Sequence, residues 1–156
     1  MNKEVQKVQK VQEVQKVTDN MDQSTYPLSA KQPKGRVLVV DDEEYAREVL
    51  GDILDSLGFE VISAKDGFEG LDSFEAESNG ISACVIDLTM PGMAGLELLE
   101  KIRNIDQTVP VILVSGYTRH EVRQKEANSA NVGFLQKPFT KGQFQDALEA
   151  RLATND

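Results

Sequence analysis

Side chains that could do chemistry follow four separate apolar runs of the sequence. They comprise three carboxylates, one hydroxyl and one ammonium, and each comes at or just after the end of its run. An aspartate alone in such a place is usually a turn residue or a helix cap. Five polar residues in matching places point instead to a shared site. The five are Asp41, Asp42, Asp87, Ser115 and Lys137.

The three carboxylates would repel one another if the fold brought them together. Two unit charges about 4 Å apart cost roughly 4 kcal/mol at an effective dielectric near 20. A cation offsets this repulsion, and Mg²⁺ suits the site because it binds carboxylate, water and phosphate oxygens. The set therefore predicts a phosphoryl site built on a carboxylate nucleophile. In this interpretation Asp87 attacks, Lys137 and the metal neutralise the transferring oxygens, and Ser115 binds a phosphoryl oxygen of the product.

The sequence lacks the motifs of other phosphate-binding and nucleotide-binding proteins. The chain has no GxxxxGK[ST] loop and no GxGxxG after its first apolar run, which argues against P-loop nucleotidases and dinucleotide-binding folds. His120 is the only histidine, and a surface position is favoured over a metal or catalytic role. Cys84 is the only cysteine and lies in an apolar run, so we expect a buried structural thiol. A single cysteine rules out an internal disulfide and fits a reducing cytoplasm.

The elements that must position these residues alternate from Arg36 onward. Short apolar runs predict five strands, at residues 37–40, 59–64, 83–86, 109–114 and 132–135. Apolar residues at helical spacing predict five helices, at residues 44–57, 68–77, 96–105, 119–130 and 140–152. The second helix should turn Phe68, Leu71 and Phe74 inward, and Thr140 should cap the last one. The helix at 119–130 is poorly apolar, so it should be the least firmly packed.

Five strand–helix units of this length predict an α/β domain with one parallel sheet and helices on both faces. Right-handed crossovers leave few topologies open. In open parallel sheets the working site lies at the carboxyl ends of the strands. The five polar residues all fall at this predicted edge.

Residues 1–35 differ in pattern from the rest. A Val-Gln-Lys/Glu triplet places valines at 5, 8, 11, 14 and 17. A period of three matches neither the 3.6 of a straight helix nor the 3.5 of a coiled coil, and valine is a weak helix former. We expect a tail or linker that is mobile when alone; the alternative is a helix that pairs with a partner or a second copy. Residues 36–156 then form the folded domain.

Composition restricts the class of protein further. The 156 residues are 40% hydrophobic and 28% charged, as in ordinary globular proteins. Residues 1–34 carry a net charge of +2, so the remainder carries −11 of the total of −9. Such an acidic body argues against direct nucleic-acid binding, which needs clustered Lys and Arg. No apolar run approaches the roughly 20 residues of a membrane helix, and no signal peptide is evident, so we expect a cytoplasmic protein away from membranes.

Four segments carry a resemblance to a known family. They are Val39–Glu43 (VVDDE), Val85–Gly95 (VIDLTMPGMAG), Leu113–Gly116 (LVSG) and Gly133–Phe139 (GFLQKPF). In order and spacing they resemble the response-regulator receiver domains of two-component signalling, over about residues 36–152. The resemblance implies a flavodoxin-like, doubly wound fold whose five parallel strands run in the order 2-1-3-4-5, with five helices.

The resemblance also implies a reaction and a set of ligands. A sensor histidine kinase or phosphotransfer protein would pass a phosphoryl group from its histidine to Asp87. Mg²⁺ would bind Asp42, Asp87 and the backbone carbonyl of Thr89, with Asp41 assisting, often through water. The Lys137–Pro138 bond would be cis. The protein would be no enzyme beyond catalysing its own phosphorylation and dephosphorylation.

Two further pairs of residues acquire roles from the resemblance. Ser115 would move to meet the phosphoryl group, and Phe134 would fill the vacated space, which would change the surface of the fourth and fifth strands and the helix at 119–130. The alternative for Phe134 is a role in the core alone. Thr89 and Tyr117 occupy the positions that tune phosphate lifetime, and a bulky Tyr117 could exclude water.

The receiver interpretation leaves output and assembly open. No output domain follows the last expected helix, so we expect a separate or upstream output protein. Both a stand-alone regulator and part of a hybrid kinase fit, and dimerisation could use the tail or the helix at 119–130. The alternative function is a phosphorylation-independent interaction module with a receiver fold. Such modules usually lose an acid or the lysine, and this sequence keeps all five residues. A phosphatase would need a second acid two positions after Asp87, where the sequence has Thr89.

Overall fold

A computed structural model of the chain describes residues 32–116 and 130–153. Its strands are β1 (Arg36–Val40), β2 (Glu60–Ala64), β3 (Ile81–Asp87), β4 (Val111–Ser115) and β5 (Val132–Gln136). Its helices are α2 (Glu44–Ser56), α3 (Gly67–Glu77), the 3₁₀ turn η3 (Ser78–Gly80), α4 (Gly95–Ile105) and α6 (Lys141–Ala153). Residues 1–31, Tyr117, His120 and nearly all of the helix expected at 119–130 lie outside the described residues.

The five strands form one parallel sheet in the order β2-β1-β3-β4-β5. The predicted fold class and strand order are therefore confirmed, and four of the five expected helices are described. Each strand begins or ends within two residues of its predicted position, and β3 and β1 pair with a register shift after Arg36. None of the described helices combines the length and the apolar character needed to cross a membrane.

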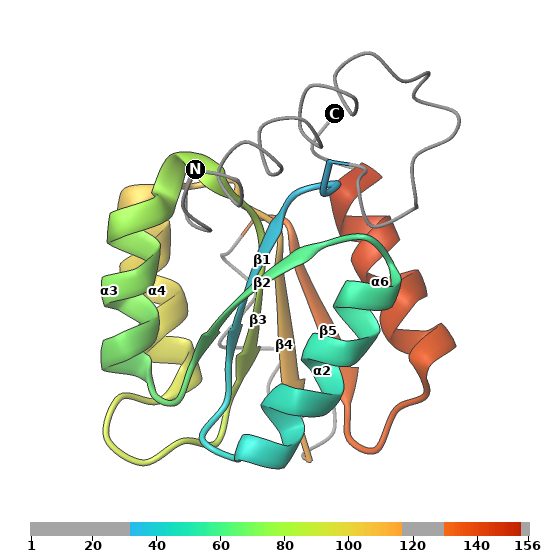
Figure 1. Cartoon of the computed structure of the whole chain (residues 1–156). Helices are drawn as coiled ribbons and strands as arrows, with labels where there is room; N and C mark the ends of the chain where they lie inside the picture. The colour runs from blue at the N-terminus through green and yellow to red at the C-terminus, as the bar shows by residue number, and fades with distance from the viewer. Residues whose placement is uncertain (1–31, 117–129, 154–156) are drawn as a thin grey trace, which may run out of the picture. The chain divides into compact units, whose positions relative to one another are not determined.

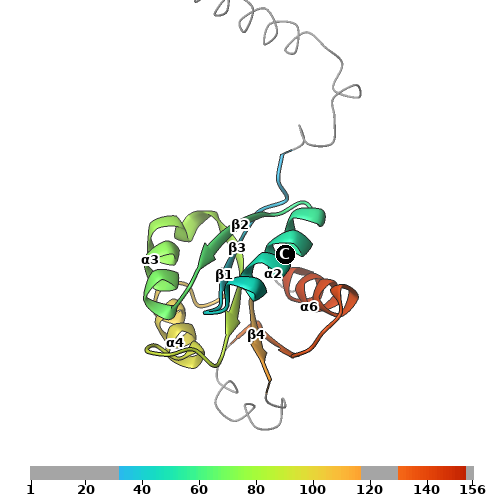
Figure 2. The same cartoon turned by 60° about the horizontal axis from the view of Figure 1, so that its bottom comes forward.

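Helices cover both faces of the sheet (Figure 1), with α3 and α4 on one face and α2 and α6 on the other. Figure 2, turned so that the lower edge of the sheet comes forward, shows the same two pairs. The central strands have no exposed face, which explains why β1 reads as a continuous apolar run. Burying one large apolar side chain contributes about 1.5–3 kcal/mol, so these two layers hold the sheet in place. The most buried helical side chains are Leu54, Phe74, Leu98, Ile102, Phe144 and Leu148.

The last helix begins as its sequence predicts. The Thr140 hydroxyl accepts a hydrogen bond from the Gln143 backbone N–H (3.1 Å), and the Gln143 side chain accepts one from the Thr140 N–H (2.8 Å). This reciprocal pair is a capping box, which satisfies two N–H groups that the helix leaves free. It fixes the start of α6 just after the loop that follows β5.

The orientation predicted for Phe68 is wrong. Phe74 is fully buried, but Phe68 is 60% exposed. Phe68 lies in the first turn of α3, where its ring approaches the loop at Gly92. The buried face of α3 runs through Gly67, Gly70 and Phe74. Phe68 precedes Phe74 by six residues, so at about 100° per residue it lies roughly 120° away from Phe74 around the helix.

Candidate functional site

The predicted polar residues gather at one edge of the sheet. Asp87 and Ser115 are the last residues of β3 and β4, and Asp41 and Lys137 come directly after β1 and β5. Because all strands are parallel, these positions share the carboxyl edge, at the bottom of the sheet in Figure 1. The Lys137 backbone N–H donates to the carbonyl of Ser115 (2.7 Å), which ties the two strand ends together.

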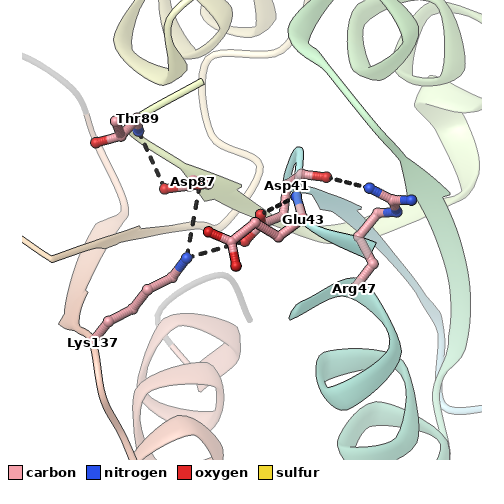
Figure 3. A network of polar contacts seen from close by, with 6 residues as sticks. All are labelled: Asp41, Glu43, Arg47, Asp87, Thr89 and Lys137. Atoms are coloured by element: carbon pink, nitrogen blue, oxygen red, sulfur yellow. Dashed lines mark hydrogen bonds and ion pairs between the residues drawn. The ribbon is translucent and has the colours of Figure 1, made fainter. Parts of the chain in front are cut away.

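The Lys137 ammonium lies between two buried carboxylates (Figure 3). Its Nζ is 3.3 Å from Asp41 Oδ2 and 3.7 Å from Asp87 Oδ2. Asp41 is 1% exposed and Asp87 5% exposed, so water screens these charges only weakly. Burial lowers the pKa of Lys137, but the carboxylates of Asp87 and Asp41 outweigh that effect, and the net pKa is raised. The lysine therefore stays charged.

Asp87 is a carboxylate held in an unfavourable environment. Burial raises its pKa to about 6; a hydrogen bond from the Thr89 backbone N–H to Oδ1 (3.2 Å) and the charge of Lys137 limit the rise, and Asp41 and Asp42 add to it. At neutral pH the group is mostly ionised and partly desolvated. A carboxylate in that state can act as a nucleophile, and the adjacent ammonium can neutralise charge that arrives with an electrophile.

The acidic residues fit a divalent cation. Asp41, Asp42 and Asp87 each offer one carboxylate oxygen, and these oxygens all lie within 4.8 Å of one another. In the part of the chain that the structure describes, this is the group of acidic residues close enough to hold a metal. Asp42 is exposed, whereas the other two are buried, so one side of the cluster faces water. Clustered hard oxygen donors with an open side match the preference of Mg²⁺.

The residues expected to switch the surface or to set the lifetime of the phosphate do not all lie in the acidic cluster. Ser115 is fully buried at the end of β4, and Phe134 is half-buried on β5, opposite Leu113, where it packs against the core beneath α3 and α4. The Lys137–Pro138 bond is cis, the isomer that the resemblance implies. Tyr117 lies outside the described residues. The switching and lifetime roles of all these residues stay predictions.

Gly95 is a site residue whose importance the sequence did not reveal. It begins α4, and a Cβ at this position would collide with the carbonyl oxygen of Asp87 and lie 2.8 Å from the Cα of Leu88. The close approach lets α4 pack directly against the backbone that carries Asp87. The only signal in the sequence is a glycine immediately before a helical run.

An apolar cavity of about 260 Å³ opens beside the charged residues. Asp41, Glu43 and Lys137 form its polar end. The remaining wall consists of α2 and of the loop after β5, and its residues are Tyr45, Ala46, Val49, Leu50, Pro138 and Phe139. Tyr45 is 76% exposed, so a large aromatic side chain stands in water next to the acidic cluster.

A family model describes the same segment. Residues 37–149 match the response regulator receiver domain, and the chain belongs to this family. It is thus a receiver domain of two-component signalling systems.

Relatives occur both as single receivers and as parts of kinases. The chain is 34% identical to chemotaxis protein CheY of Treponema pallidum over 117 residues, which cover 72% of this chain and 81% of the relative. It is 36% identical over 117 residues to sensor histidine kinase RcsC of Salmonella typhi, covering 75% of this chain but only 12% of the kinase. Among solved structures, CheY in the CheX–CheY–BeF3–Mg complex of Borrelia burgdorferi has a TM-score of 0.71 and 28% identity, covering 76% of this chain and 89% of that chain.

Proposed function

We propose that Asp87 accepts a phosphoryl group from a phosphohistidine of a sensor histidine kinase or phosphotransfer protein. A carboxylate oxygen of Asp87 forms the new P–O bond while the P–N bond to the imidazole breaks, and the imidazole keeps that electron pair. The product is an aspartyl phosphate, whose extra charge switches a protein-interaction surface. The protein thus acts as a phosphoacceptor and catalyses no reaction on other substrates.

One observation carries this proposal: the Lys137 ammonium lies within 4 Å of the carboxylates of both Asp41 and Asp87 at the carboxyl edge of the sheet. Such a charge can neutralise a phosphoryl oxygen as the group arrives. The Thr89 N–H already holds one oxygen of Asp87 and so orients the nucleophile. Asp41, Asp42 and Asp87, with the Thr89 carbonyl, would hold Mg²⁺, which when bound offsets the carboxylate repulsion and polarises the phosphoryl oxygens.

The apolar cavity supports the same proposal from the side of the partner. A phosphohistidine must approach within bonding distance of Asp87, so its carrier has to cover the edge of the sheet. Tyr45, Val49 and Phe139 offer exposed or half-exposed apolar surface next to Lys137. Aromatic side chains in such positions contribute much of the energy of protein interfaces. A partner helix that presents its histidine between apolar residues would suit this surface.

The proposal also covers how phosphorylation would reach an output protein. Ser115 and Phe134 would relay phosphorylation to the surface of β4 and β5, and the output would be a separate or upstream protein. Thr89 and Tyr117 would set the lifetime of the phosphate. A homodimer through the tail or the helix at 119–130 stays open.

Incubation with Mg²⁺ and acetyl phosphate, followed by intact-protein mass measurement, tests the proposal. We expect one added phosphoryl group in the native protein, none when EDTA removes Mg²⁺, and none in Asp87→Asn. Phosphoramidate, whose P–N bond resembles that of phosphohistidine, should give the same product. A folded native protein that gains no phosphoryl group from either donor would favour the phosphorylation-independent interaction module.

A further inference from the structure

Every polar atom of Asp41 has a partner. Its backbone N–H donates to the carbonyl of Ala64 (3.2 Å), and its Oδ1 accepts from the Glu43 N–H (2.9 Å). Its Oδ2 pairs with Lys137, and its backbone carbonyl accepts a hydrogen bond from Arg47 Nη1 at 2.7 Å. Four contacts thus fix Asp41, the first residue of the loop from β1 to α2.

Arg47 stands in an unusual place for a cation. It lies in the first turn of α2, where its backbone N–H donates to the carbonyl of Glu43 (3.1 Å). The N-terminal turn of a helix carries a partial positive charge, which disfavours a basic residue there by about 0.3–1 kcal/mol. The guanidinium reaches back past the helix start to the strand end, as Figure 3 shows. A residue that breaks a local rule in this way usually has a compensating contact, and here the contact is the Asp41 carbonyl.

That carbonyl belongs to the peptide group that joins Asp41 to Asp42. A charge-assisted hydrogen bond to its oxygen fixes the plane of this peptide, from which the Asp42 side chain extends. Asp42 is exposed, yet its carboxylate lies within 4.8 Å of those of Asp41 and Asp87. Three like charges at this separation would move apart if the loop were free.

We propose that Arg47 is a positioning residue, which acts through the Asp41–Asp42 peptide to hold Asp42 in the acidic cluster and so sets the affinity of the site for Mg²⁺. This inference rests on the proposed function, because it requires that the cluster binds the metal. It assigns a role to a residue outside the cluster itself. Residues that orient metal ligands typically change metal affinity by 10–100-fold when they are replaced.

Charge and geometry predict opposite results for Arg47, which makes the proposal testable. If only the charge mattered, a neutral residue would remove a repulsive cation and Mg²⁺ would bind more tightly. If the hydrogen bond matters, the loop loosens and Mg²⁺ binds more weakly. We expect the dissociation constant for Mg²⁺, measured by calorimetry on the full chain, to rise about tenfold in Arg47→Met. Arg47→Lys keeps the charge and one donor, and should show a smaller rise.

Arg103 provides a matched control. Its guanidinium also donates to backbone carbonyls, those of Asp106 and Ala130, at positions away from the acidic cluster. Arg103→Met makes the same chemical change, so it should lower stability without changing the Mg²⁺ dissociation constant. If Arg47→Met does not fold, as judged by circular dichroism, Arg47→Lys carries the test.

A second measurement separates positioning from catalysis. The Mg²⁺ concentration that gives half the maximal phosphorylation rate should rise with the dissociation constant in Arg47→Met. The maximal rate at saturating Mg²⁺ should stay within about twofold of the native rate, because the loop is then held by the bound metal. Equal or tighter Mg²⁺ binding in both Arg47 variants would overturn the proposal. A native protein that binds no Mg²⁺ would instead overturn the metal site of the proposed function, and this inference with it.

Discussion

Replacing Lys137 with methionine is expected to slow phosphorylation of Asp87 by about 10²–10³-fold at saturating Mg²⁺. The ammonium lies 3.3 Å from Asp41 and 3.7 Å from Asp87, where charge from the incoming phosphoryl oxygens would develop. Methionine has a similar length but no charge and no N–H donor. Initial rates of mass increase with acetyl phosphate measure the effect.

The affinity for Mg²⁺ should rise in Lys137→Met, although the phosphorylation rate falls. The ammonium competes with a metal for the oxygens of Asp41 and Asp87, so Lys137→Met should bind Mg²⁺ more tightly than the native protein. Lys101→Met, a change on α4 away from this edge, should leave both quantities unchanged. A native phosphorylation rate in Lys137→Met would show that the lysine has no part in the transfer.

The second large effect concerns stability. Without metal at pH 7, Asp87→Asn is expected to be more stable than the native protein by about 2–3 kcal/mol. This is the free energy that corresponds to the rise of the Asp87 pKa from 3.8 to about 6, which burial causes. Asparagine has nearly the same shape and carries no charge that must be desolvated. Urea unfolding in EDTA gives the difference.

The effect should depend on pH with a definite sign. The native Asp87 carboxyl binds its proton more tightly than the unfolded one, so its contribution to stability falls as pH rises from about 4 to 6. The advantage of Asp87→Asn should therefore be nearly absent at pH 4 and complete by pH 7. Asp52→Asn, an exposed change on α2, should give a small effect at both values. An Asp87→Asn protein that is less stable at pH 7 would contradict the account.

Much of the fold follows from local patterns in the sequence. The run RVLVV must be a strand buried on both faces, because it has no polar alternation and ends at two aspartates. Once five such runs are parallel, their carboxyl ends must share one edge. The meeting of Asp41, Asp87 and Lys137 was therefore predictable from the order of elements alone, before any side chain was placed.

The features that could not be predicted depend on how closely a helix packs against another part of the chain. We predicted that Phe68 faces inward with Phe74, but the buried face of α3 runs through Gly67, Gly70 and Phe74, and the two glycines give no hydrophobic signal that would reveal it. The constraint on Gly95 comes from the backbone of Asp87, which belongs to a different element. In both cases a glycine occupies the closely packed position, and a glycine gives no hydrophobic signal in the sequence.

Arg47 escaped prediction for a related reason. Its long side chain crosses from the first turn of α2 to the end of β1, and its partner is a backbone carbonyl, which has no sequence signature. The sequence shows a basic residue three positions after the acidic run 41–44, but it does not show the direction of that side chain. The tail or linker expected at residues 1–35, with a pairing helix as the alternative, stays a prediction, because residues 1–31 lie outside the described residues.

The most direct test of the central claim is to map the phosphorylated residue. Sodium borohydride reduces an acyl phosphate to an alcohol, so a phosphorylated aspartate becomes homoserine while free carboxylates do not react. After incubation with Mg²⁺ and acetyl phosphate, peptide mass spectrometry should find homoserine at position 87, and find none when EDTA is present. Homoserine at another aspartate, or a phosphoryl group that resists borohydride, would contradict the assignment of Asp87 as the acceptor.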